Sequence, residues 1–157
     1  MLKAIYKVRN GFGIVRSPLI ESYEYPEDMR DHQGALKREY RHEGTKRVYE
    51  ARWKYLADAF QELEEQNLDA QVEWGSEFRQ TIIPLRKCRA QLKYAIESML
   101  DREKNPEDYE DMTAEDKAEE RSILYESGED SDFDKLTPQI NIAIKQFEDK
   151  LRPLIKG

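Results

Sequence analysis

The sequence predicts a mostly α-helical protein: an antiparallel bundle of three long helices, one short acidic helix and a small N-terminal β-hairpin. The first observation is that large apolar residues recur at alternating intervals of four and three in three segments, a spacing that places them on one stripe of a helix. The second is composition. With 38% apolar and 38% charged residues, the chain suits long helices that each bury one stripe, and a shared core must cover these stripes.

The three stripes lie in residues 46–66, 78–100 and 137–154. Their members are Tyr49, Trp53, Leu56, Phe60 and Leu63; then Phe78, Ile82, Leu85, Leu92, Ile96 and Met99; and finally Ile140, Ile144, Phe147, Leu151 and Leu154. Each stripe therefore predicts one long helix.

Residues 1–26 are expected to form a hairpin and a connector ahead of the helical bundle of residues 27–157. Two short β-leaning runs flank Asn10 and Gly11, the dipeptide that most favours a two-residue hairpin turn. Because two strands alone are only marginally stable in water, this hairpin should dock on the helices or on a partner. Pro18 and Pro26 then mark an extended connector.

Helical character begins at Glu27, and Gly44 suggests a break from which a new helix restarts with Thr45 as its cap. Extending the first stripe forward misses the second by one residue, which predicts a turn at Asn67 and two antiparallel helices. Pro84 falls within the second stripe. Since the apolar register continues across this proline, a kink is expected there.

Acidic charge is concentrated in an insertion, residues 101–134. This segment holds 15 acidic and 4 basic residues, a balance of −11 in a chain whose net charge is −7. Thr113 followed by Asp116 resembles a capping box that opens a short helix ending near Glu126. So few apolar side chains predict a mobile acidic arm. After it, Thr137 and Pro138 mark the start of the last helix.

The composition also bounds the cellular setting. No apolar run approaches the roughly 18 residues needed to cross a bilayer, and the N-terminus lacks a signal-peptide block. The single cysteine, Cys88, allows no internal disulfide and is expected to be a small core residue. We therefore expect a cytoplasmic protein without a membrane span.

Three aspartates resemble part of a calcium loop. Asp130, Asp132 and Asp134 occupy its first, third and fifth positions. The sixth position is Lys135 where the loop needs glycine, and the twelfth is Asn141 where it needs glutamate, so a solvated acidic loop is favoured. His32 and His42 show no metal-ligand spacing either. No catalytic residue, cofactor or metal site is assigned.

These observations favour a non-enzymatic interaction module, an adaptor or regulatory subunit that binds a protein partner through charged surfaces. A homodimer is compatible with this interpretation. The alternative is a small nucleic-acid-associated protein or a nucleic-acid-mimicking antagonist, suggested by basic residues that recur every seven positions from Arg79 to Lys93. The low isoelectric point argues against nucleic acid. The expected partner-binding residues are Asp108, Glu110, Asp111, Glu129, Asp130, Asp132 and Asp134.

Overall fold

A computed structural model describes residues 1–127 and 132–156, and within these ranges the secondary structure is helical, with no strand. The longer helices are α1 (Leu2–Val15), α2 (Arg41–Trp74), α4 (Ile83–Lys104), α5 (Ala114–Leu124) and α6 (Thr137–Ile155). A single turn, α3 (Phe78–Thr81), precedes α4. Short 3₁₀ turns lie at Ser22–Glu24, Glu27–Met29, Arg38–Tyr40 and Pro106–Tyr109.

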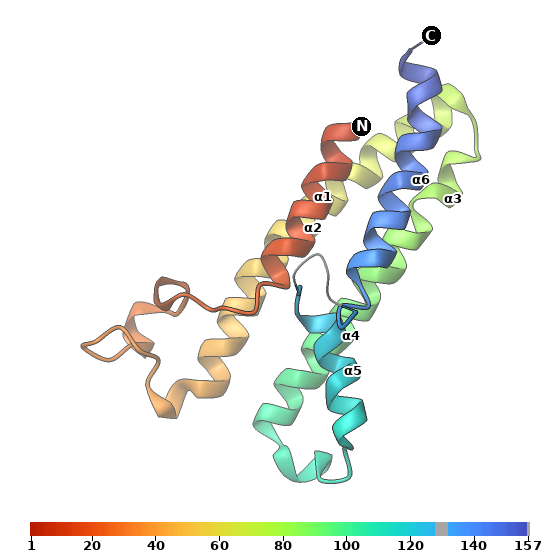
Figure 1. The fold of residues 1–157 in the computed structure, drawn as a ribbon. Coiled ribbons are helices and arrows are strands. Elements are labelled where there is room, and N and C mark those ends of the chain that lie inside the picture. Colours follow the sequence, from red (N-terminus) through yellow and green to blue (C-terminus); the bar gives the residue numbers. More distant parts are fainter. Residues whose placement is uncertain (128–131, 157) are drawn as a thin grey trace.

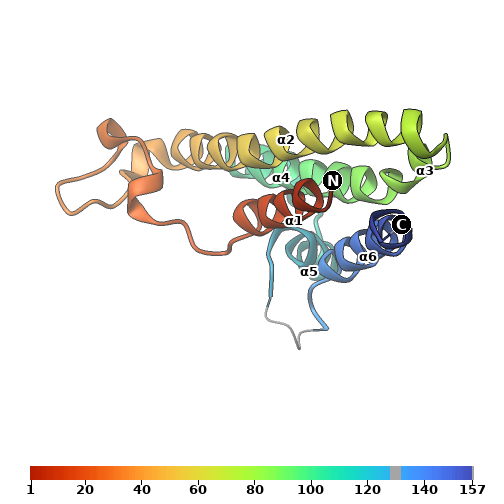
Figure 2. The ribbon, with the colours of Figure 1, turned by 90° about the horizontal axis from the view of Figure 1, so that it is seen from above.

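Four helices, α1, α2, α4 and α6, pack around one apolar core (Figures 1 and 2). Successive long helices alternate in direction, so α2 runs antiparallel to both α1 and α4 (Figure 1). Every stripe predicted from the sequence contributes to this core, for example through Leu56, Leu92 and Phe147, which are fully buried. The predicted bundle is therefore present, but with a fourth long helix.

The additional helix is α1, so the predicted N-terminal hairpin is wrong. The buried residues of α1 are Ala4, Ile5, Val8, Gly11, Phe12 and Val15. Their spacing follows a helix face and not the alternation of a strand. Phe12 packs edge-on against Phe60 of α2, with ring centroids 5.9 Å apart. Burying this face against α2 outweighs the local preference of Asn-Gly for a turn.

Gly11 is explained by a close approach between two helices. A Cβ at this position would lie 3.0 Å from the Cα of Leu56 on α2. Glycine here costs helix propensity but lets the two backbones come together. Gly13, two residues later, is under no such constraint, because a Cβ added there would meet only a side-chain oxygen of Glu126, at 3.6 Å.

The turn after the first stripe lies eight residues later than predicted. Helix α2 continues through Asn67, which is buried inside it, and ends at Trp74. Gly75, with a φ of 114°, turns the chain, and Trp74 then packs against Phe78 with ring centroids 5.6 Å apart. The mismatch in register correctly indicates a break. The predicted position is wrong because the alternating spacing also fits Asn67 and Ala70.

Two further predictions about the helices are corrected. The helix predicted over residues 78–100 is divided at Ile82 into α3 and α4. Pro84, where a kink was predicted, lies in the first turn of α4, since a helix start needs no backbone donor there. The segment after Glu27 is an extended arm with 3₁₀ turns, and α2 begins at Arg41 and runs unbroken through Gly44. A Cβ on Gly44 would lie 2.5 Å from the side chain of Leu36, so this glycine admits the arm against the helix.

Beyond the ends of α1 and α6 the molecule divides into two prongs (Figure 1). One consists of the arm, residues 17–40, on the N-terminal part of α2; the other consists of α5 on the C-terminal part of α4. A cleft of about 620 Å³ separates them and is lined by Tyr25, Leu36, Met99 and Tyr125, among others. The ion pair between Arg41 and Glu103, at 3.4 Å, spans it.

Candidate functional site

Within the described residues of the predicted acidic arm, 101–127 and 132–134, the chain is folded and forms one prong of the molecule. Helix α5 starts at the capping box expected from the sequence. The Asp116 amide donates to Thr113 Oγ1, and the Thr113 amide donates to Asp116 Oδ2, both at 3.1 Å. These bonds satisfy amide groups that the first turn of α5 would otherwise leave free. The prediction of a short acidic helix is thus confirmed, with α5 ending at Leu124.

A buried carboxylate attaches α5 to α4. Glu120 accepts hydrogen bonds from both terminal nitrogens of Arg102, at 2.6 and 2.8 Å, and a third from Ser98 Oγ at 3.2 Å. Arg102 also donates to the sulfur of Met112. Leu124, which is fully buried, adds apolar contact with the core. Two-point pairing of this kind fixes the orientation of the helix as well as its position.

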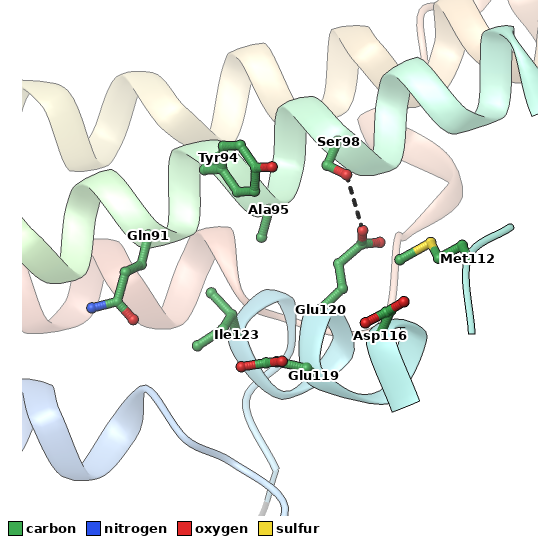
Figure 3. Close-up of a pocket in the computed structure, with 9 residues that line it drawn as sticks. All are labelled: Gln91, Tyr94, Ala95, Ser98, Met112, Asp116, Glu119, Glu120 and Ile123. Carbon is green, nitrogen blue, oxygen red and sulfur yellow. Dashed lines mark hydrogen bonds between the residues drawn. The ribbon is translucent and has the colours of Figure 1, made fainter. Parts of the chain in front are cut away.

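A hollow of about 380 Å³ lies between α4 and α5. Figure 3 shows Ala95 and Ser98 of α4 facing Ile123 and Glu120 of α5 across it. The complete lining is Gln91, Tyr94, Ala95, Ser98, Met112, Asp116, Glu119, Glu120 and Ile123. We call this hollow the α4–α5 groove.

The α4–α5 groove combines negative charge with an exposed aromatic ring. Tyr94 is 75% exposed, although a large aromatic side chain usually finds cover. Glu120 is neutralised by Arg102, and Asp116 is engaged by the capping box. The Glu119 side chain is exposed, and its carboxylate forms no hydrogen bond or ion pair with any residue that the structure describes. The lining of the groove therefore includes a free carboxylate, an accessible ring and an apolar wall.

The predicted partner-binding residues occupy different places. Asp108, Glu110 and Asp111 are exposed at the tip between α4 and α5, and Asp132 is exposed near the start of α6. Glu129 and Asp130 lie outside the described residues. Asp108, Glu110, Asp111 and Asp132 do not line the α4–α5 groove.

Asp134 is buried and acts within the fold. Its carboxylate pairs with Arg16 at 2.6 Å, with both side chains at least 96% buried. It also accepts hydrogen bonds from the amides of Leu136 and Thr137, which lie at the start of α6. Burial tends to raise the pKa of this carboxyl, but hydrogen bonds from Arg16 and Thr137 outweigh burial and hold the pKa below its ordinary value.

Arg16 joins three parts of the chain at the point where the prongs diverge. Besides Asp134, its guanidinium donates to Thr137 Oγ1 and to the backbone carbonyls of Ser122, Ile123 and Tyr125. Cys88 is buried nearby, as predicted, and burial raises the pKa of its thiol to about 11. A protonated, enclosed thiol is a poor nucleophile, so Cys88 is not suited to catalysis. Arg16 has a structural role, because all these bonds lie within the fold.

Sequence reasoning missed the residues that line the groove. The lining residues on α5 are Asp116, Glu119, Glu120 and Ile123, which share one helix face, and Met112 lies just ahead of the helix. This pattern is present in the sequence, but it does not stand out as an apolar stripe because the lining mixes Met and Ile with carboxylates. Tyr94 lies off the apolar stripe of α4 and gives no signal.

Comparisons with protein-family models, with curated proteins and with solved structures find no match for this chain. Among residues 1–127 and 132–156, no group of three or more His, Cys, Asp or Glu side chains is placed to hold a metal ion. No helix in the described part of the chain is long and apolar enough to cross a membrane.

Proposed function

We propose that this protein is a non-enzymatic interaction module and that the α4–α5 groove binds a lysine- or arginine-bearing segment of a partner protein. The observation that supports the proposal is the placement of Tyr94 and the free Glu119 carboxylate around one hollow. A cationic side chain beside an aromatic ring and near a carboxylate gains from both interactions.

The apolar part of the groove favours a side chain over a small free cation. Ala95, Met112 and Ile123 provide a surface against which the methylene stem of a lysine or arginine can pack. Such side chains bury their stems while the charged group stays at the wet rim. This division matches a groove whose wall is apolar and whose carboxylates lie on α5.

Long-range charge supports the same class of partner. The segment that contains α5 carries a net charge of −11, whereas the rest of the chain is net positive. Concentrated charge of one sign speeds the encounter with an oppositely charged partner and loses its effect as salt rises. We therefore expect association with a basic segment to weaken strongly with ionic strength.

The test is a titration of the full chain, labelled for NMR, with a short lysine- and leucine-containing helical peptide. The expected result is that shifts concentrate on Tyr94, Glu119 and Ile123. Glu119→Lys should abolish these shifts, because it places a like charge in the groove without removing any side-chain contact within the described fold. The matched control is Glu115→Lys, the same change in charge on the same helix but outside the groove.

Equal loss of binding in Glu119→Lys and Glu115→Lys would overturn the proposal that the groove is the binding site, since only overall charge would then matter. The same peptide with glutamate in place of lysine should not bind. The alternative function, a nucleic-acid-associated protein, is tested by adding duplex DNA to the wild-type chain. Salt-dependent DNA binding that survives Glu119→Lys would favour the alternative.

A further inference from the structure

A second hollow lies on a different face of the molecule, between α2 and α4, and two matching sequence patterns line it. The pattern is Lys, apolar, Glu, apolar at positions i, i+3, i+4 and i+7. On α2 it comprises Lys46, Tyr49, Glu50 and Trp53, and on α4 it comprises Lys93, Ile96, Glu97 and Leu100. These eight residues are the full lining of a hollow of about 360 Å³.

The two patterns are related by a local two-fold axis, because α2 and α4 run antiparallel (Figure 1). Trp53 and Lys93 lie at the same end, since both also line the next hollow along the two helices. Lys46 and Leu100 therefore lie at the opposite end. The lining of this hollow has two lysines and two glutamates, and it has no net charge.

The floor of this hollow is apolar and incompletely covered. Tyr49 and Ile96 are buried in the core of the chain, but Trp53 and Leu100 are only partly covered. The adjoining hollow, of about 390 Å³, includes the small side chains of Ala57 and Ala90. The residues of α2 that line the two hollows run from Lys46 to Glu64, about 27 Å along the helix axis. We call this surface the α2–α4 face.

We propose that the α2–α4 face is a homodimer interface on which a second copy of this chain docks with the same face about a two-fold axis. Two-fold interfaces require a patch that is complementary to itself. A helix with Lys at i and Glu at i+4 meets this requirement, because a second copy running antiparallel places its Glu50 opposite Lys46 and its Lys46 opposite Glu50.

Charge also selects a second copy on this face over docking through other surfaces. The acidic segment would repel its counterpart in another copy, whereas the hollow lined by Lys46, Glu50, Lys93 and Glu97 is balanced in charge and would not. Exposed rim charges contribute chiefly register and orientation, while covering Trp53 and Leu100 supplies the apolar term. The dimer leaves the α4–α5 groove available, so this inference does not depend on the proposed function.

The test is sedimentation velocity across a wide concentration range for wild type, Lys46→Glu and the charge-swapped double variant Lys46→Glu with Glu50→Lys. Wild type should dimerise in a concentration-dependent way. Lys46→Glu sets Glu opposite Glu at two symmetric places and should raise the dimer dissociation constant about tenfold. The double variant restores opposite charges and should restore the dimer.

A matched control is Lys145→Glu, which reverses one member of the exposed Lys145–Asp149 pair on α6. This variant should dimerise like wild type. Circular dichroism on each variant would show that the fold is retained. A wild-type chain that stays monomeric at all concentrations would overturn the proposal. Equal effects of Lys46→Glu and Lys145→Glu, or a double variant that fails to recover, would overturn it as well.

Discussion

At the end of the bundle where α1 and α6 cover α2 and α4, the buried contacts are mainly apolar. Fully buried side chains such as Ile5, Phe60 and Phe147 fill the space between helices. At the other end, where the prongs diverge, each segment is held by a buried or half-buried arginine. Arg52 holds the arm through Glu24 and the carbonyls of Ser17 and Leu19.

The same scheme recurs on the second prong, where Arg102 holds α5 through Glu120 and Arg16 holds the junction with α6. Apolar contact tolerates small shifts, but a guanidinium that bonds several acceptors fixes one geometry. The difference shows that apolar packing stabilises the bundle, whereas hydrogen bonds to arginine stabilise the forked end. The two ends should therefore fail under different perturbations.

The largest effect is expected when the charge of Arg16 is removed. Arg16→Met leaves the buried Asp134 carboxylate without its ionic partner and should cost about 3–5 kcal/mol in the free energy of unfolding. Urea denaturation would measure this loss. Leu56→Ala, a cavity variant in the bundle, should cost about 2–5 kcal/mol, so comparable losses would show that the polar junction matters as much as the core.

Acid should weaken the forked end before the bundle. Hydrogen bonds from Arg52 hold the pKa of Glu24 below its ordinary value, as Arg16 and Thr137 do for Asp134. A depressed pKa in the folded state gives stability that is present above the unfolded pKa and is lost as pH falls through the folded pKa. The urea concentration at the midpoint of unfolding should therefore decrease as the pH is lowered below about 4.

The bundle variant Leu56→Ala should keep this acid dependence, because Glu24 and Asp134 remain paired in it. Arg16→Met should lose the part that comes from Asp134. An identical pH profile for wild type and Arg16→Met would show that the pair with Arg16 does not control the titration of Asp134.

Two glycines on α1 sharpen the account of the bundle end. Gly11→Ala introduces a Cβ at 3.0 Å from the Leu56 backbone and should cost about 1–3 kcal/mol through overpacking. Gly13→Ala meets only the end of the flexible Glu126 side chain and should gain up to about 1 kcal/mol from helix propensity. Thermal unfolding of the two variants should shift in opposite directions. Shifts in the same direction would contradict the close helix approach.

The most local effect is expected in the arm. Glu24→Gln keeps the shape of the side chain but removes the charge that Arg52 faces, and should cost about 1–2 kcal/mol locally. Hydrogen exchange should speed up at amides of the arm, such as Glu24 and Tyr25, while amides in α6 keep their protection. Faster exchange throughout the chain would show that the arm and the bundle unfold as one unit.

The stripes of α2, α4 and α6 could be predicted because helical periodicity is a local property. The same holds for the capping box of α5, in which Thr113 and Asp116 are three residues apart. The α4–α5 groove could be predicted only in part: the acidic character of α5 is visible in the sequence, whereas its pairing with Tyr94 depends on how α5 docks. That docking is set by Arg102 and Glu120, 18 residues apart.

The sequence by itself determined that this is a helical bundle, because each apolar stripe must be buried whatever its neighbours are. Only the tertiary structure decided that residues 2–15 are helical, since contact with Leu56 and Phe60 overrides the local turn preference of Asn10 and Gly11. It also decided that Asp134 is a structural residue. Its partner Arg16 lies 118 positions away, and no local pattern distinguishes a carboxylate that will meet an arginine from one that will remain in water.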